Sequence, residues 1–270
     1  MGMTRRHSMV VKRVLPCLLV LALAAWLLGS ATGCYAVVTG SGDLETREMD
    51  FSGFTELEVG YAFEVEISAG ASYSVTITVD DNLFQHLDVS QTGETLHIGL
   101  KGNTGCRNCT LRAAVTMPQI VAVELSGASS GTIGGFSTSD SLDVDLSGAS
   151  SLDMTDMDVG VADLHLSGAS NISGSIDTDD VAFDLSGASS LELEGSGGDA
   201  SISASGASHG GLEGFQVEDA DVQFSGASTG TVNASGTLDV DLSGASVLYY
   251  VNSPTLGSVN ISGASSLQQK

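Results

Sequence analysis

Residues 123–129 read Val123-Glu124-Leu125-Ser126-Gly127-Ala128-Ser129, and this stretch decides the fold because its second half recurs along the chain. The tetrapeptide Ser-Gly-Ala-Ser occurs eight times, at intervals of 18 to 21 residues. Its copies begin at Ser126, Ser147, Ser167, Ser186, Ser205, Ser225, Ser243 and Ser262. A period of this length is typical of solenoid proteins, in which each repeat contacts mainly its neighbours.

Two apolar columns precede the tetrapeptide in every repeat. The residue directly before the first serine is apolar in all eight copies, and so is the residue two positions earlier, whereas the residues between them are mostly polar. The column residues are Val123 and Leu125, Val144 and Leu146, Leu164 and Leu166, Phe183 and Leu185, Ile202 and Ala204, Val222 and Phe224, Val240 and Leu242, and Val259 and Ile261. Alternation with period two predicts a strand with one buried face.

A second, shorter stretch of alternating apolar and polar residues follows the tetrapeptide, as with the apolar Leu152 and Met154. A segment of variable sequence, with an apolar residue such as Phe136, then completes the repeat. Two or three strands in so few residues cannot form a helical repeat, which needs more than 30 residues. We therefore predict an all-β fold, a right-handed single-stranded parallel β-helix (solenoid) with about 19–20 residues per coil.

The tetrapeptide is expected to form the corner of each coil. Its glycine is predicted to adopt a backbone conformation closed to residues with a Cβ atom, its alanine to pack into the corner, and its serines to form hydroxyl ladders along the outside. The corner glycines are Gly127, Gly148, Gly168, Gly187, Gly206, Gly226, Gly244 and Gly263. The last coil is expected to be incomplete, so its open edge needs a cap, a partner or another copy, and end-to-end self-association is one expected interaction.

The repeat divides the chain into four parts. Residues 113–270 carry the regular repeat. Residues 43–112 alternate without the regular corner, so we expect them to form the N-terminal cap and the first irregular coils. Residues 34–42 are expected to be a tether, and residues 1–33 a lipoprotein signal peptide.

The signal peptide is predicted from a basic start, an apolar stretch and a cleavage motif. Its basic residues are Arg5, Arg6, Lys12 and Arg13. The apolar residues 14–28 are fewer than the roughly 20 that span a membrane comfortably. The sequence Ala31-Thr32-Gly33-Cys34 then resembles a lipobox, which implies cleavage before Cys34 and lipidation of its side chain. An ordinary secretory signal and an uncleaved anchor remain the alternatives.

Charge limits the partners of the mature chain. The chain has nine Lys and Arg residues, four of them in the signal peptide, and 33 Asp and Glu residues, none of them there, so the mature net charge is −28. Such a surface repels phosphate backbones and anionic lipid headgroups, which excludes nucleic-acid binding and leaves lipid on Cys34 as the only expected membrane attachment.

Two cysteines remain after Cys34, in the sequence Cys106-Arg107-Asn108-Cys109. In an exported chain they are candidates for a disulfide that closes a turn. A redox-active pair is the alternative, although that chemistry favours a helix N-terminus, and these neighbours read as strand and turn.

The stretch from Met117-Pro118 through the alternating strand to Ser126-Gly127-Ala128-Ser129 resembles the GIN-domain family of auto-transporter adhesin head domains. Residues 50–54, Asp-Phe-Ser-Gly-Phe, and Asn82-Leu83 resemble the N-terminal part of that family, so the likeness covers residues 43–267. The resemblance implies a parallel β-helix on the bacterial cell envelope, and it supplies no catalytic residues and no cofactor. Tyr35 after the lipidated cysteine, in place of an aspartate, favours the outer membrane or the cell surface by the same kind of resemblance.

Three candidate chemistries are weighed against a purely structural interpretation. The G-x-S-x-G motif of hydrolases is matched three times, but each match lies in the structural repeat and lacks the strand-turn-helix context that the motif needs. The matches are Gly127-Ala128-Ser129-Ser130-Gly131, Gly206-Ala207-Ser208-His209-Gly210 and Gly226-Ala227-Ser228-Thr229-Gly230. Stacked aspartates could act as the carboxylate pairs of a sugar-cleaving enzyme or gather calcium, a hard cation that prefers oxygen ligands. The weak calcium candidates are Asp143, Asp163, Asp221 and Asp239. Solvated outward faces are the favoured interpretation, with no catalytic residue, metal site or cofactor.

The sequence thus favours a non-enzymatic lipoprotein of the cell envelope that presents a stiff acidic β-helix to an unidentified surface or envelope partner, as an adhesin or an assembly module. Two alternatives stay open. One is a carbohydrate-active enzyme on the same scaffold, and the other is a periplasmic binding or sensing module.

Overall fold

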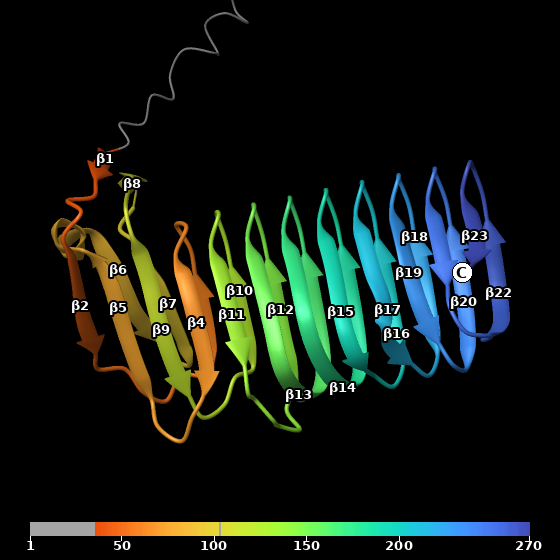
Figure 1. The fold of residues 1–270 in the computed structure, drawn as a ribbon, viewed down its shortest axis with the longest axis horizontal. Helices are drawn as coiled ribbons and strands as arrows, with labels where there is room; N and C mark the ends of the chain where they lie inside the picture. The colour runs from red at the N-terminus through yellow and green to blue at the C-terminus, as the bar shows by residue number, and fades with distance from the viewer. Residues whose placement is uncertain (1–35, 103) are drawn as a thin grey trace, which may run out of the picture. The chain divides into compact units, whose positions relative to one another are not determined.

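The computed structural model describes residues 36–102 and 104–270 (Figure 1). One short 3₁₀ helix, η1 (Asp81–His86), interrupts a chain built from strands. The strands are β1 (Ala36–Thr39), β2 (Leu44–Met49), β3 (Glu56–Val59), β4 (Glu64–Ala69), β5 (Ser74–Asp80), β6 (Leu87–Thr92), β7 (Thr95–Leu100), β8 (Thr104–Arg107), β9 (Leu111–Met117), β10 (Ala122–Leu125), β11 (Ser130–Gly134), β12 (Leu142–Leu146), β13 (Ser151–Leu166), β14 (Asn171–Leu185), β15 (Ser190–Ser196), β16 (Ala200–Ala204), β17 (His209–Val217), β18 (Ala220–Phe224), β19 (Thr229–Ala234), β20 (Thr237–Leu242), β21 (Val247–Tyr250), β22 (Thr255–Ile261) and β23 (Ser266–Gln269). No helix in the described part of the chain is both long and apolar enough to cross a membrane.

The strands form two stacks of parallel neighbours, one on each side of the corner. The β3 stack runs β7, β3, β10, β12, the second halves of β13 and β14, then β16, β18, β20 and β22. The β4 stack runs β9, β4, β11, the first halves of β13 and β14, then β15, β17, β19, β21 and β23. Successive coils lie side by side in Figure 1, and the predicted parallel solenoid is confirmed.

The apolar columns make a continuous core, as the alternation predicted. Leu146, Leu166 and Leu185 are direct neighbours in register, and each is at most 1% exposed. Fourteen of the sixteen column residues are buried. The two exceptions, Val259 and Ile261, belong to β22 in the last coil, which no described strand covers on its outer side.

The corner is built differently from the expectation. All eight corner glycines have φ between +71° and +77°, so the prediction for glycine is confirmed. The alanine, however, is exposed, as at Ala128, and the last serine of each complete corner is buried instead. The hydroxyl of Ser129 donates to the carbonyl oxygen of Ser126 at 2.9 Å, and six of the other seven corners repeat this bond, the last corner being the exception. The prediction of an external hydroxyl ladder is therefore wrong: the last serine donates to a carbonyl oxygen of its own corner, and the first serine, as at Ser167 and Ser186, donates to a carbonyl oxygen of the preceding coil.

Backbone hydrogen bonds join successive corners. The amide of Ala149 donates to the carbonyl oxygen of Gly127 at 2.9 Å, and the amide of Ala169 donates to that of Gly148 at 2.8 Å. Since each corner repeats this contact with the corner before it, the turns continue the hydrogen bonding of the strands.

The N-terminal part is threaded out of chain order. β3 lies between β7 and β10, and β4 lies between β9 and β11. β5 pairs antiparallel with both β2 and β9, and β6 pairs antiparallel with β7. Residues 43–112 therefore hold antiparallel strands as well as coils. β1, within the expected tether of residues 34–42, pairs with β8.

Candidate functional surface

The outer face of the β3 stack carries two columns of side chains, which lie in register on successive strands. The first column holds the outward residue directly before the first member of each inner apolar pair, and it contains the four calcium candidates. Its order is Ala122, Asp143, Asp163, Ala182, Ser201, Asp221 and Asp239. The structure thus pairs Asp143 with Asp163 and Asp221 with Asp239, but Ala182 and Ser201 separate the two pairs.

This arrangement adds little support for calcium binding. Each aspartate pair brings two carboxylates together, and a bound Ca²⁺ takes six to eight oxygen ligands. Over residues 36–102 and 104–270, no group of three or more His, Cys, Asp or Glu side chains has an arrangement that could hold a metal ion. One oxygen of Asp239 also accepts a hydrogen bond from the amide of Ser258. Calcium binding stays a prediction from the sequence.

The second outward column of the β3 stack contains an unbroken row of three carboxylates. Glu58, Glu124 and Asp145 are direct register neighbours, with His97 before them and His165 after them. His97 Nδ1 lies 3.4 Å from a carboxylate oxygen of Glu58. A hollow of about 390 Å³ lies along this row. We call Glu58, Glu124 and Asp145 the acidic row.

The acidic row carries unfavourable electrostatic energy. Partial burial raises the pKa of Glu124 above its ordinary value, and repulsion from Glu58 and Asp145 raises that pKa further, while His97 lowers it. Like charges directly opposite on neighbouring strands destabilise a sheet. A cation bound along the row would relieve this repulsion.

The outer face of the β4 stack is richer in hydroxyl and amide groups. One of its columns runs Ser130, Ser151, Asn171, Ser190, His209 and Thr229. A hollow of about 710 Å³ follows β13 to β19 on this side, and Lys270 reaches into it to form an ion pair with Glu213. Both stacks carry carboxylates, but the unbroken acidic row lies on the β3 stack, whereas the β4 stack has this column of hydroxyl, amide and imidazole groups beside scattered acidic residues such as Asp153, Glu192 and Glu194.

The hydrolase-like motif has no free nucleophile at its serine. Ser129, Ser208 and Ser228 are at most 1% exposed. Each donates its hydroxyl hydrogen to the carbonyl oxygen of the first serine of its own corner. Their role in the structure is to hold the corner closed.

Cys106 and Cys109 are joined by a disulfide, with their Cα atoms 6.0 Å apart. The bond closes the turn between β8 and β9, and the amide of Gly40 donates to the carbonyl oxygen of Arg107 at 3.1 Å. The disulfide thus lies where the segment before β2 meets the cap. Cys34 itself lies outside the described residues.

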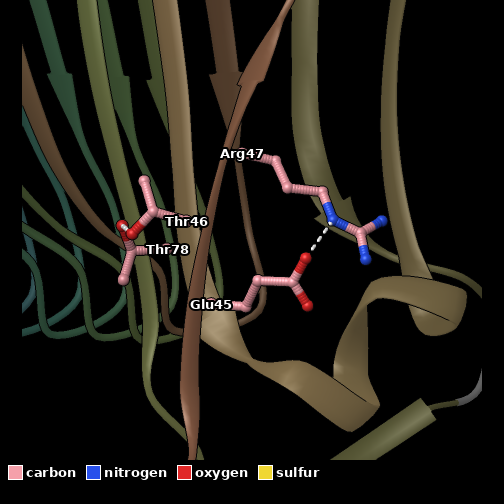
Figure 2. A network of polar contacts seen from close by, with 4 residues as sticks. All are labelled: Glu45, Thr46, Arg47 and Thr78. Atoms are coloured by element: carbon pink, nitrogen blue, oxygen red, sulfur yellow. Dashed lines mark hydrogen bonds and ion pairs between the residues drawn. The ribbon is translucent and has the colours of Figure 1, made fainter.

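Polar contacts tie the first strand of the cap to its neighbours (Figure 2). The Arg47 guanidinium donates to a carboxylate oxygen of Glu45 at 2.8 Å and lies 3.8 Å from the ring centre of Phe84. On the other face of β2, the hydroxyls of Thr46 and Thr78 are 2.9 Å apart. These groups are exposed, so we assign them to the edge of the cap and not to a binding site.

A buried carboxylate holds the cap together. Asp80 is 1% exposed, and its two oxygens accept hydrogen bonds from the amides of Gly42, at 2.7 Å, and Thr110, at 2.8 Å. The amide of Thr110, and then that of Gly42, lowers the pKa of Asp80 below its ordinary value, since both bonds favour the charged form. Asp80 thus connects the segment before β2 with the segment after the disulfide.

Replacing this carboxylate should weaken the fold in a pH-dependent way. In Asp80→Asn one of the two amides loses its acceptor, so we expect the free energy of unfolding to fall by about 1.5–3 kcal/mol at pH 7. Because the folded-state pKa is lowered, the stabilisation is present above pH ~4 and is lost as the pH falls through the folded-state pKa. Urea unfolding at pH 7 and pH 3 measures both effects. The exposed neighbour Asp81→Asn is the control, expected within about 0.5 kcal/mol of the unchanged protein. Equal losses in the two variants at pH 7 would contradict this assignment.

These observations define a class of protein: a repeat scaffold with extended, chemically distinct outer faces. The chain belongs to the family described as "Putative auto-transporter adhesin, head GIN domain", whose model matches residues 53–254. No curated protein matches the chain.

Several solved structures share the fold. A "putative adhesin" from Parabacteroides merdae is 16% identical, with a TM-score of 0.81 over 87% of this chain and 99% of the other. A "putative adhesin" from Parabacteroides distasonis is 19% identical, with a TM-score of 0.80 over 87% of this chain and all of the other. A "putative lipid binding protein" from the same species is 20% identical, with a TM-score of 0.78 over 87% and 99%. At these identities the likeness extends to the fold alone.

Proposed function

We propose that the chain is a non-enzymatic lipoprotein of the cell envelope, held in the membrane by lipid on Cys34, that presents the acidic face of its β3 stack to a positively charged partner. The observation that carries the proposal is the acidic row of Glu58, Glu124 and Asp145, held in register on three adjacent strands. A rigid backbone keeps these carboxylates close although they repel one another. Binding of a cationic surface would relieve that repulsion without rearrangement of the scaffold.

A role for the chain as an adhesin or assembly module is supported by the family description and by the names of the two Parabacteroides adhesins. The fold supports it physically, because a solenoid offers a long surface to which many weak contacts can add. A carbohydrate-active enzyme gains less support, since the outward carboxylates here form columns, and among the described residues no Phe, Tyr or Trp side chain lines the hollow along the acidic row.

Binding of a cationic probe by the full chain in neutral detergent tests the acidic face. We expect a fluorescent oligolysine peptide to bind at low salt and to bind at least tenfold more weakly to the triple variant Glu58→Gln, Glu124→Gln, Asp145→Asn. The matched control neutralises three acidic residues of the β4 stack, in Asp153→Asn, Glu192→Gln, Glu194→Gln, and should change affinity less than threefold. Equal losses in the two triple variants would mean that net charge alone attracts the peptide, and the proposed face would be wrong.

Protease treatment of intact cells separates surface display from a periplasmic role. If the chain is displayed on the cell surface, we expect added protease to cleave it on intact cells. Protection until the envelope is opened would instead favour a periplasmic binding or sensing module.

A further inference from the structure

The last coil exposes side chains that every earlier coil buries. Leu256, Val259 and Ile261 of β22 are 44%, 39% and 46% exposed. They pair in register with Leu238, Val240 and Leu242 of β20, which are at most 2% exposed. Among the described residues no strand pairs with the outer edge of β22 or β23, the two strands at the C-terminal end of the stack in Figure 1. This end therefore offers both apolar side chains and free backbone hydrogen-bonding groups.

The last coil also differs from the others in charge. The chain contains 33 acidic residues, yet Asp241 is the last of them, and residues 242–270 contain none. In the outward column, Asp241 is followed in register by the neutral Asn260. Lys270, the single charged side chain of this segment, pairs with Glu213 several coils away. A neutral, apolar end on a strongly anionic chain lets two copies meet there without repulsion between carboxylates.

The other end of the stack does not complement this surface. There the core is closed by the cap, where Phe54 and Leu83 are fully buried, and the edge strand β2 carries Glu45, Arg47 and Glu48. A head-to-tail contact would set a charged, closed edge against an open apolar one. A two-fold contact sets two identical open edges against each other, and such an interface is closed by symmetry.

We propose that two copies of the chain pair through their last coils, residues 255–269, across a two-fold axis. The edge strands of the two copies run antiparallel, so each stack continues into its counterpart through new backbone hydrogen bonds. Leu256, Val259 and Ile261 of each copy become buried, as their equivalents are in every earlier coil. This interaction is independent of the acidic face, which lies on the outside of the stack.

Sedimentation of the full chain in density-matched detergent tests the pairing. We expect a dimer, and we expect Val259→Asp to weaken it at least tenfold, because a carboxylate would be placed in the contact. Val161→Asp is the matched control, since Val161 is equally exposed, at 41%, but lies in the middle of the stack. Circular dichroism checks that both variants remain folded. Val259 is already open to solvent in the single chain, so its replacement does not disturb a closed core.

A charge-complementation experiment identifies the second copy as the partner. Val259→Asp and Val259→Lys should each be monomeric alone, and a mixture of the two should regain the dimer. A monomeric unchanged chain, a dimer unaffected by Val259→Asp, or a mixture that stays monomeric would each overturn the proposal. Assemblies larger than the dimer would show head-to-tail contacts and would overturn it as well.

Discussion

Gly187→Ala is expected to lower the free energy of unfolding by at least about 3 kcal/mol, although it adds one methyl group. Gly187 has φ of +74°, a left-handed conformation that costs a residue with a Cβ atom about 1–2 kcal/mol. The added Cβ atom would also collide with the carbonyl oxygen of Gly168 in the preceding corner. That oxygen accepts the amide of Ala188, so it cannot move without loss of a hydrogen bond between coils.

Thermal unfolding of the full chain measures this effect, with an expected decrease in Tm of roughly 6 °C or more for a chain of this size. Gly210→Ala is the matched control in the same region, because Gly210 has no positive φ and nothing lies near the position of its added Cβ atom. Its Tm should change by no more than a few degrees. If both variants lost the same stability, close stacking of the corners would not be the cause.

Cys34→Ala is expected to abolish acylation of the protein, so that any chain freed of its signal peptide is found in the soluble fraction of disrupted cells. The sequence offers the lipid on Cys34 as the only attachment, since the body has a large negative charge and is repelled by anionic headgroups. Fractionation followed by immunoblotting measures the distribution. Mass spectrometry of the unchanged protein should show an acylated N-terminal cysteine.

Cys17→Ala is the control for this experiment, because Cys17 lies in the apolar stretch of the signal peptide and should be removed with it. Its distribution should equal that of the unchanged protein. An unchanged protein that keeps residues 1–33 and stays in the membrane would support an uncleaved anchor. An unchanged protein that is cleaved but carries no lipid would support an ordinary secretory signal.

The regular part of the fold could be predicted because one sequence pattern repeats in it. Apolar residues such as Leu146 and Leu166 recur at a fixed distance from a glycine, and in a parallel stack equal positions must become neighbours. The same logic paired Asp143 with Asp163 correctly. It failed for the corner, where alanine and serine are both small. The sequence does not show that the last serine can bury its hydroxyl by donating to a carbonyl oxygen of its own corner. Ser129 does so, and Ala128 is left outside.

The acidic row could not be predicted for a different reason. Glu58 and Glu124 are 66 positions apart in the sequence and meet only because β3 lies between β7 and β10. Residues 43–112 contain no regular corner from which a register could be read. Which strand lies beside which is decided there by packing and by contacts such as those of Asp80, which no periodic pattern encodes.

The insertion of β3 and β4 between later strands sets an order of assembly. Their neighbours on both sides come from residues 95–117 and 122–134, so β3 and β4 cannot complete their pairing until about half of the chain is available to fold. Every coil after it needs only the coil before. The N-terminal half should thus act as a slow, all-or-none nucleus with high contact order, on which the rest of the solenoid grows rapidly, one repeat at a time.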